Sequence, residues 1–593
     1  MKACDNLSEF IELLESEGEL LRIGEEISPE IEISKITDAE SKKPGGGKAL
    51  LFTNVVDGGK RKFNVATNLF GSEKRMAMAL GVGNLEEAGN RISELIKTRP
   101  PKSFSEIFGL AKSALSILKT SPRKWNKKAP PPCQEVVKLG DEIDIGDIPV
   151  LKCWPHDGGK FITLPLVFTQ SPDGSEKNLG MYRLQVFDKN TTGMHWHIHK
   201  DASHHFGEYS KIGKRMPVSV AIGADPATIY AATAPMPRGI YELLLAGFFR
   251  GKGVKTAKCI TNDIEVPAES EFILEGYVDV DERRLEGPFG DHTGYYSQAD
   301  MYPVFHLTAL THRRNPTYCA TLVGPPPMED CYMAKATERI FLPMLRMVMP
   351  EISNYFLPWE GVFHNICIVS IKKEYPAHAQ KLFSGLWGQG QMGFCKAIVA
   401  VDADVNPKDL SAIWKLFAEK FDAARDVFLS YGVLDVLDHS SPTPLMGAKI
   451  GIDLTTPRKE EPQRKASNLK IADDRRLGEI RNFIREDACF KNCEFLPYFA
   501  AFSIEKGEQN GRQILHKLAN SKLFDGYFRA AIIFDADIDI SNKSKMLWKV
   551  FNNTDPSRDI IFSESNCAFV DACKKNSADG YLREWPEDLS FDK

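Results

Sequence analysis

Two carboxylates stand five residues apart in one short segment of this 593-residue chain. Glu286 and Asp291 flank the turn sequence Gly-Pro-Phe-Gly, and this spacing can direct both side chains into one pocket. A second cluster, 178–183, lies upstream and combines the amide of Asn178 with the cation of Arg183. Acids that face a guanidinium can handle a carboxylate and move a proton, so the two segments indicate a carboxylate-handling enzyme rather than a binding module.

Both clusters belong to a region whose pattern is typical of strands. Runs rich in β-branched and aromatic residues alternate with Gly, Pro, Asp and Asn turns between residues 133 and 325. The predicted strands are 164–169, 181–187, 218–222, 272–280 and 304–311. This region is expected to be a β-barrel or a sandwich.

Helices and strands alternate on both sides of this region. Residues 1–125 are expected to form an N-terminal α/β domain, which ends at a basic, proline-rich break. Residues 331–456 return to the alternation that is typical of an α/β layer with central strands. The charged segment 458–470, which contains a proline, is the expected linker to the rest of the chain.

Residues 471–593 repeat part of the preceding domain. The matching segments are 396–405 with 530–538, 413–414 with 547–548, and 422–426 with 555–559. The second copy lacks the Gly-Ala-Lys-Ile-Gly sequence that follows the first. It is therefore expected to be a degenerate partial repeat that serves packing or oligomerisation without chemistry.

Composition excludes several classes of function. With 43% hydrophobic and 26% charged residues and a net charge of -5, the chain lacks the basic excess of a broad nucleic-acid surface. No run of about 18 apolar residues predicts a membrane span, and the N-terminus lacks the pattern of a signal peptide. The twelve cysteines are scattered singly, which is typical of free thiols in a reducing compartment. A cytoplasmic location is the prediction.

Several segments, in one order, closely resemble the UbiD-type decarboxylases of quinone biosynthesis, which use prenylated FMN. The segments are 178–183, 217–228, 260–267, 286–296 and 447–453. The resemblance covers residues 1–456 and implies a multidomain α+β fold. In that fold a split β-barrel at 133–325, of the flavin-reductase type, holds the flavin between N-terminal and C-terminal α/β domains.

The resemblance also implies a site, residue by residue. Arg183 would pair with the substrate carboxylate, Glu286 would deliver the proton that replaces CO2, and Asp291 would complete the charge network, although the roles of the two acids could be exchanged. The cofactor-binding residues would be Asn178, Met181, Tyr182, Arg183, His199, Thr233, Pro235, Glu242 and Lys449. Lys449 matches a lysine that contacts the flavin phosphate, a task that suits a point charge.

A metal site is part of the same resemblance. Asn178, His199 and Glu242 would hold a divalent ion, Mn2+, with K+ nearby. An amide oxygen, an imidazole and a carboxylate suit such an ion when it keeps positions for phosphate oxygens. His195 and His197 are expected to be bystanders on the same strand face.

The expected function is the non-oxidative decarboxylation of an aromatic acid of the hydroxybenzoate or naphthoate type. The end of the chain at 579–586 resembles members of the futalosine branch of menaquinone biosynthesis, which favours that pathway slightly over ubiquinone. A flavin prenyltransferase would supply the cofactor, and a homo-oligomer is expected. Two alternatives stay open: a reversible carboxylase of a phenolic or other aromatic ring, and a non-catalytic flavin-binding assembly subunit.

Overall fold

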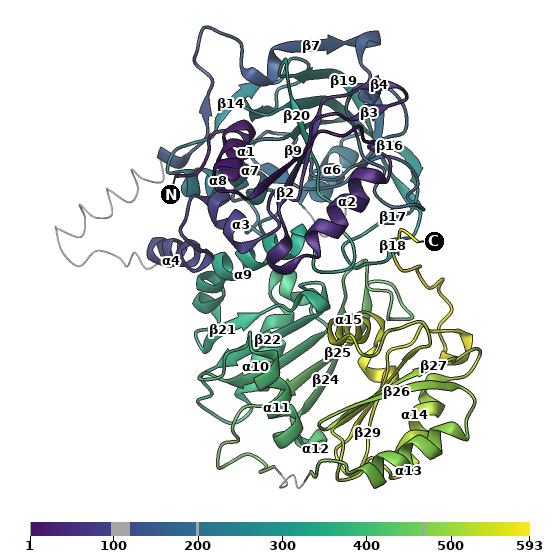
Figure 1. Ribbon diagram of the computed structural model, residues 1–593. Helices are drawn as coiled ribbons and strands as arrows, with labels where there is room; N and C mark the ends of the chain where they lie inside the picture. Colours follow the sequence, from purple (N-terminus) through teal and green to yellow (C-terminus); the bar gives the residue numbers. More distant parts are fainter. Residues whose placement is uncertain (1, 97–118, 197–200, 465–468, 593) are drawn as a thin grey trace, which may run out of the picture. The chain divides into compact units, whose positions relative to one another are not determined.

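The computed structural model describes residues 2–96, 119–196, 201–464 and 469–592, which Figure 1 shows as a ribbon. They form two compact units. The first contains the residues up to Pro343 and also those from Glu587 onward, and the second contains Met344–Pro586. The final residues thus join the first unit rather than the rest of 471–593. Within the described ranges, no helix is long and apolar enough to cross a lipid bilayer.

A four-stranded sheet forms the N-terminal part of the first unit. Its order is β1-β2-β5-β20, and every residue of β2 is buried. The last strand comes from much later in the chain and pairs in parallel with β5, so it ties this sheet to the middle region. The elements are β1 (Leu20–Ile23), β2 (Ala49–Phe52), β5 (Asn64–Thr67), β20 (Thr317–Cys319), α1 (Leu7–Ser16), α2 (Glu32–Ser41), α3 (Glu73–Leu80) and α4 (Leu85–Ile96).

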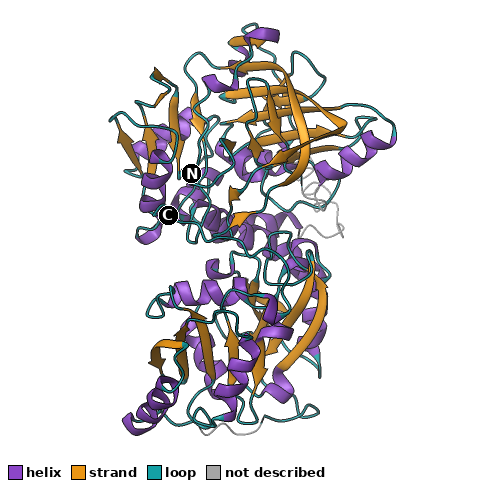
Figure 2. Cartoon of the chain, turned by 90° about the vertical axis from the view of Figure 1, so that its right-hand side faces the viewer, coloured by secondary structure: helices purple, strands orange, loops and turns teal. Residues whose placement is uncertain are grey.

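A seven-stranded antiparallel sheet forms the core of the middle region, and Figure 2 shows the curvature of its long strands. The order is β10-β9-β13-β16-β19-β12, with β7 paired to β19. The strands are β7 (Val136–Leu139), β9 (Leu166–Gln170), β10 (Lys177–Gly180), β12 (Thr191–Gly193), β13 (Met216–Ile222), β16 (Phe272–Glu286) and β19 (Asp300–His312). Together with the helices, they confirm the expected multidomain α+β class.

Smaller elements surround this sheet. The helices are α6 (Asp201–Lys211), α7 (Pro226–Ala231), α8 (Glu242–Arg250) and α9 (Glu329–Val348). The short strands are β6 (Arg123–Lys124), β8 (Phe161–Ile162), β11 (Leu184–Gln185), β14 (Lys255–Lys258), β15 (Glu265–Pro267), β17 (Phe289–Gly290) and β18 (Tyr296–Ser297). The last two form a hairpin that follows β16 directly.

The long strand β16 carries an acid from the core to the site. Its first half is buried on both faces, its second half alternates and then becomes exposed, and its last residue, Glu286, is buried again. It pairs with β19 at both ends, with an irregularity between Val278 and Arg283, and Glu286 lies opposite Asp300. The sheet thereby fixes the position of the Glu286 backbone.

The second unit contains two five-stranded sheets with the same strand order. Three central parallel strands have one antiparallel strand at each edge, in the orders β21-β22-β23-β25-β24 and β26-β27-β28-β30-β29. The first sheet has β21 (Ile352–Phe356), β22 (Ile366–Ile371), β23 (Ala397–Asp402), β24 (Val427–Val433), β25 (Met446–Asp453), α10 (His378–Trp387), α11 (Leu410–Lys420) and α12 (Ala423–Asp426). The second has β26 (Phe490–Leu496), β27 (Phe499–Ile504), β28 (Ala530–Asp535), β29 (Ile560–Phe562), β30 (Ala568–Asp571), α13 (Asp474–Arg485), α14 (Gly511–Asn520), α15 (Lys543–Asn553) and α16 (Pro556–Asp559).

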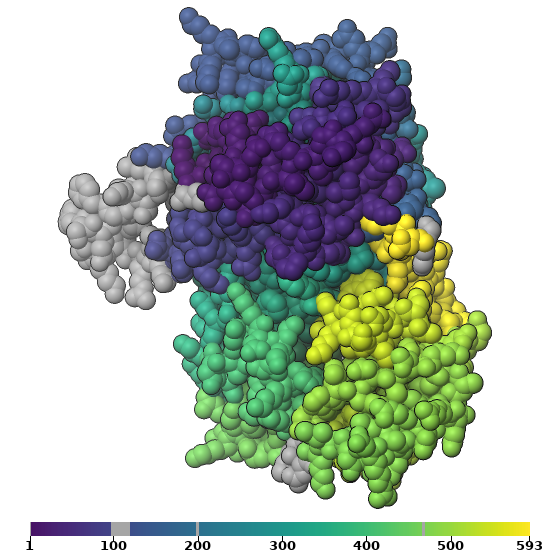
Figure 3. All heavy atoms as spheres, in the orientation of Figure 1, coloured from purple at the N-terminus to yellow at the C-terminus, as the bar shows by residue number. Residues whose placement is uncertain are grey.

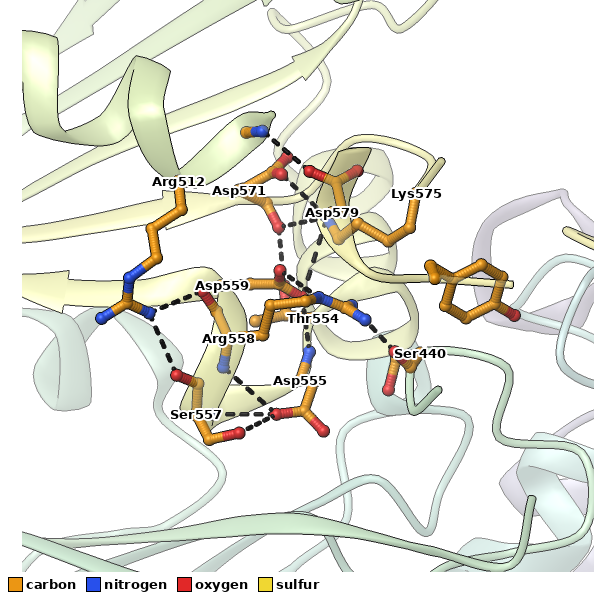
Figure 4. A network of polar contacts seen from close by, with 12 residues as sticks. Ser440, Arg512, Thr554, Asp555, Ser557, Arg558, Asp559, Asp571, Lys575 and Asp579 are labelled. Carbon is orange, nitrogen blue, oxygen red and sulfur yellow. Dashed lines mark hydrogen bonds and ion pairs between the residues drawn. The ribbon is translucent and has the colours of Figure 1, made fainter. Parts of the chain in front are cut away.

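Each of the two sheets has a buried ion pair at the equivalent place. Lys373, after β22, pairs with Asp453 at 3.3 Å, and Lys506, after β27, pairs with Asp571 at 3.1 Å. All four side chains are at most 3% exposed. Figure 4 shows the second network, in which Lys575 also contacts Asp571 at 3.1 Å. Each buried charge is therefore paired, as burial requires.

The contacts between the two sheets are reciprocal. The backbone N–H of Ala423 donates to Asn566 Oδ1 at 3.0 Å, and the N–H of Ala448 donates to Asp555 Oδ2 at 3.4 Å. Each contact joins the Asp-x-x-Arg-Asp segment of one half to the last parallel strand region of the other. Such exchange of roles is the mark of an isologous interface between two copies of one fold.

Candidate active site

Arg183 lies between two carboxylates in the first unit. Its Nε donates to Glu286 Oε1 at 2.9 Å, and its Nη1 forms an ion pair with Asp291. Its Nη2 donates to Ser297 Oγ at 3.0 Å, and its Cζ lies 4.6 Å from the centre of the Phe289 ring. The side chains of the arginine and the two acids are at most 10% exposed. The structure thus brings together the three residues predicted to be catalytic.

The β17–β18 hairpin presents Asp291 at its turn. The N–H of Asp291 donates to the Tyr295 carbonyl at 3.0 Å, and the N–H of Gly294 donates to the Asp291 carbonyl at 2.9 Å. On the preceding strand, the N–H of Gly290 donates to Asp157 Oδ1 at 2.7 Å. Backbone hydrogen bonds therefore hold this acid in place on both sides.

His195 contacts the acid cluster, whereas the sequence predicted only a bystander to the metal site on a strand face. Its Nδ1 lies 2.8 Å from Glu286 Oε1, and its ring lies 4.1 Å from the ring of Tyr302. It is 5% exposed. Strand β12 ends at Gly193, so the strand alternation that was used to assign faces does not extend to this histidine. His197 lies outside the described residues.

His292 also contacts an acid, although an extended chain would turn it away. Its Nδ1 lies 2.9 Å from Asp291 Oδ1, and its backbone N–H donates to the same oxygen at 2.7 Å. The two residues lie in a turn, where neighbouring side chains do not alternate between faces. His195 and His292 therefore each contact one of the two predicted acids.

Burial and charge act in opposite directions on the two acids. Burial works to raise the pKa of Glu286, but Arg183 and His195 outweigh it, and the net pKa is lowered. The pKa of Asp291 is also lowered, because Arg183 and His292 outweigh the burial that works to raise it. The cationic neighbours of both acids therefore favour their ionised forms. Within the described ranges, the buried Oε2 atom of Glu286 has no hydrogen-bond partner, so this oxygen is available for proton transfer.

Two of the three predicted metal ligands lie close together. Glu242 is the first residue of α8, where a negative charge is favoured, and its Oε2 accepts from the N–H of Leu179 at 2.8 Å. The side chain of the adjacent Asn178 donates to Thr169 Oγ1 at 3.3 Å. Both predicted ligands are at most 6% exposed. The third, His199, lies outside the described residues.

The charge of Glu242 fits a cation ligand. Burial raises the pKa of Glu242 to about 7, and no described Lys, Arg or His side chain lowers it. A buried carboxylate without a cationic partner is costly, and a divalent ion would offset that cost. Among the described residues, no group of three or more His, Cys, Asp or Glu side chains could hold a metal, but the predicted set includes an amide and His199.

The other predicted cofactor residues of the first unit lie near these two groups in the chain. Met181 is half-buried, and Tyr182 is buried with its ring against Gly180, where a Cβ atom would lie 2.3 Å from the tyrosine Oη. Thr233, after α7, donates from Oγ1 to the Tyr230 carbonyl at 2.7 Å. Pro235 is half-buried in the same segment.

Lys449 belongs to the second unit. It lies on β25 and is 2% exposed, and its Nζ donates to the carbonyls of Gly393 at 2.6 Å and Cys395 at 2.8 Å. Burial lowers its pKa to about 8. It is therefore not a solvated surface charge, and its contact with a flavin phosphate stays a prediction.

Three family models match most of the chain. They are the N-terminal domain of 3-octaprenyl-4-hydroxybenzoate carboxy-lyase at residues 11–95, its Rift-related domain at 124–326, and its C-terminal domain at 331–454 and 487–580. The chain belongs to the UbiD family of carboxy-lyases. The recognition of this family from the sequence is confirmed.

Relatives of this UbiD protein differ in length. An uncharacterised protein of Archaeoglobus fulgidus is 49% identical over 464 residues, which is 77% of this chain and 93% of that protein. An uncharacterised protein of Helicobacter pylori is 38% identical over 595 residues, which is 98% of this chain and 94% of that protein. Some relatives therefore match nearly the whole of this chain, and others match a shorter part.

Solved structures of UbiD enzymes share the fold. The vanillic acid decarboxylase of Sedimentibacter hydroxybenzoicus in its closed form is 26% identical, with a TM-score of 0.70 over 82% of this chain and 99% of that chain. An evolved dimeric form of the enzyme HmfF from Pelotomaculum thermopropionicum, in complex with prFMN, is 26% identical, with a TM-score of 0.64 over 77% of this chain and 96% of that chain.

Proposed function

We propose that this UbiD protein is a non-oxidative decarboxylase of an aromatic acid, of the hydroxybenzoate or naphthoate type, that uses prenylated FMN. One observation carries the proposal: a buried Arg183 lies between Glu286 and Asp291, and one Glu286 oxygen has no hydrogen-bond partner among the described residues. A cation binds the substrate carboxylate, and a buried acid beside it supplies a proton. The similar structures named for vanillic acid and for prFMN support the substrate class and the cofactor.

The residues of this chain bind and orient the acid. Arg183 pairs with the substrate carboxylate, and its ion pair with Asp291 fixes the orientation of the guanidinium. When bound, prenylated FMN supplies the electron sink that carbon–carbon cleavage on an aromatic ring needs. The bond between the ring carbon and the carboxyl carbon breaks, CO2 leaves, and a proton from Glu286 replaces it on the ring carbon.

Substrate binding itself explains how Glu286 comes to hold that proton. Arg183 and His195 keep this acid ionised. A substrate carboxylate brings a negative charge into the same buried space and shares Arg183, and both effects raise the pKa of a neighbouring acid. Glu286 is therefore charged before binding and becomes a proton donor in the complex.

Four predicted residues are proposed to hold the metal and the flavin phosphate. Asn178, Glu242 and His199 would coordinate Mn2+, and Lys449 would contact the phosphate. No cation among the described residues lowers the pKa of the buried Glu242, which supports this assignment. The nearby K+, the menaquinone or ubiquinone pathway and a flavin prenyltransferase as cofactor supplier are part of the same proposal.

The compartment and assembly follow the family expectation. All twelve cysteines are free thiols, and eleven of them are buried, which supports a reducing compartment such as the cytoplasm. A homo-oligomer is proposed as well, and its measurement is the mass of the purified protein in solution.

Glu286→Gln tests the proposed reaction. The amide keeps the shape of the acid but cannot donate a carboxylic proton, so CO2 release should fall by about 100-fold to 10,000-fold while flavin content stays unchanged. Glu282→Gln, on the same strand but 40% exposed, is the matched control and should keep its activity. Turnover at the wild-type rate by flavin-loaded Glu286→Gln would refute the assignment.

Glu242→Ala tests the metal site. Manganese content and flavin retention should both fall, measured by elemental analysis and by absorbance of the purified protein. Glu208→Ala, on the surface of α6, is the control and should retain both. Unchanged occupancy of metal and flavin in Glu242→Ala would remove this residue from the ligand set.

A further inference from the structure

Residues 587–591, here called the return strand, lie against the hairpin that carries Asp291. The preceding 344–586 form the second unit, and the chain then joins the first unit again. Figure 1 marks the C-terminus beside β17 and β18, and Figure 3 shows the yellow end of the chain at the molecular surface. Neither its position nor its partners were expected from the sequence.

The return strand extends the hairpin by one strand. The N–H of Tyr296 donates to the Glu587 carbonyl at 3.0 Å, and the N–H of Leu589 donates to the Gly294 carbonyl at 2.9 Å. Asp588 pairs with Tyr295 as an antiparallel bridge between these two bonds. A hairpin alone is marginally stable in water, and a third strand adds backbone bonds that hold it.

Apolar contacts fix the same strand. Leu589 is 7% exposed and belongs to the main core of the first unit. The ring of Phe591 stacks on Trp154 at 4.3 Å between ring centres. A Cβ atom on Gly290 would lie 2.1 Å from Trp154 Cδ1 and 2.9 Å from Leu589 Cδ2, so these two side chains enclose the residue that precedes Asp291.

The hairpin in turn holds the arginine. Asp291 forms an ion pair with Arg183. Ser297 accepts a hydrogen bond from Arg183 Nη2 at 3.0 Å, and the ring of Phe289 lies under the Arg183 guanidinium. All three residues belong to the segment that the return strand supports. We propose that the return strand positions the substrate-binding Arg183 through this hairpin, with Leu589 and Phe591 as its positioning residues. The proposal rests on the proposed function of Arg183.

The test compares a chain stopped after Pro586 with Leu589→Ala and Phe591→Ala. In the stopped chain, kcat should fall about ten-fold or more while flavin content changes less than about two-fold, because misplacing a bound group slows the reaction step. Hydrogen exchange of the peptide 290–297 should become about ten-fold faster while the rest of the first unit stays protected. Leu582→Ala, at an 88% exposed leucine, is the matched control and should leave both readings at wild type.

Two further measurements decide between positioning and general loss of structure. In the full chain, Leu589→Met and Phe591→Tyr should keep most of the kcat that the alanine variants lose. A peptide of residues 585–593, added to the stopped chain, should restore kcat with saturation. The same peptide with serine at 589 and 591 should not. The proposal would be overturned if the stopped chain kept the kcat and the hydrogen exchange of the wild type. Faster hydrogen exchange throughout the first unit would also overturn it.

The failure of the proposed function would be seen separately. If the flavin-loaded wild-type protein releases no CO2 from any aromatic acid in a screen, the decarboxylase proposal fails. The exchange of 290–297, with and without the return strand and with the added peptide, still reports whether this strand holds the hairpin.

Discussion

At the residue scale, the site is a buried arginine and two acids that change one another's pKa. The acids Glu286 and Asp291 raise the pKa of Arg183 against the effect of burial, and Arg183 lowers theirs. His195 and His292 each add a contact to one acid. The two carboxylates therefore share one cation, and each also contacts its own histidine.

Proton uptake on binding is the first consequence. A non-reactive aromatic carboxylate should raise the pKa of Glu286 from below its ordinary value, so the protein should take up a proton as the ligand binds. The measurement is calorimetry in buffers of different ionisation enthalpy near pH 6. Glu286→Gln should bind without this uptake, and equal uptake by both proteins would contradict the mechanism.

Arg183→Met should destabilise the first unit in a pH-dependent way. Removing the partner leaves two buried carboxylates unpaired, at a cost of about 3–5 kcal/mol at neutral pH. A carboxyl whose pKa is lowered by folding stabilises the fold above its unfolded pKa and loses that contribution as the pH falls. The difference in thermal unfolding between variant and wild type should therefore narrow below about pH 4, near the ordinary pKa of Asp291. A constant difference from pH 3 to pH 7 would argue against the pairing.

Much of this residue-level arrangement could be predicted, and some could not. The spacing of Glu286 and Asp291 around a turn, with Arg183 upstream, predicted a cluster that the structure brings together; their catalytic roles stay predictions. The contact of His195 depends on where β12 ends, and three alternating histidines do not reveal that. Their pattern suggested a strand face, whereas the first of them leaves the strand and contacts an acid.

At the scale of elements, the hairpin is the part that sequence patterns described least well. The predicted strands 218–222 and 304–311 lie within β13 and β19, because their apolar residues reflect burial directly. The predicted strand 272–280 continues to Glu286, since its polar second half is held by pairing with β19. The predicted strand 181–187 is reduced to β11, and Arg183 lies before it.

Gly290→Ala should disrupt the hairpin. The new Cβ would overlap Trp154 and the return strand, which should lower the free energy of unfolding by about 1–3 kcal/mol and speed the exchange of 290–297. Gly207→Ala, in α6 with open space around it, is the control and should be neutral or slightly stabilising. Equal stability of both variants would show that the enclosure of Gly290 has no energetic effect.

At the scale of the whole molecule, the second unit is a pair of like sheets with a reciprocal interface. We infer that the second sheet is a degenerate partial repeat of 331–456, as the matching segments predicted, and that it covers a face of the first sheet in the manner of a second copy. Strand order and the ion networks repeat, whereas Lys449 has Cys567 at the equivalent register. The repeat thus keeps the scaffold and lacks the predicted phosphate contact.

Arg529→Met tests this interface. Arg529 is 2% exposed, and it donates to the carbonyls of Ala418 at 3.0 Å and Asn566 at 2.8 Å. Its loss leaves buried carbonyls unpaired, each at a cost of about 1–3 kcal/mol, so the thermal unfolding of the second unit should shift to lower temperature. Arg512→Met removes an exposed arginine that also binds carbonyls and should have little effect. Similar melting of the two variants would contradict the importance of the interface.

The return strand also sets an order of events in folding. Tyr296 can pair with Glu587 only after the chain has passed through the whole second unit, and closing so large a loop is entropically costly. Pairings between distant segments form late. During refolding, the secondary structure of both units should therefore return before the Trp154–Phe591 stack, and catalytic competence should be the last property to be regained.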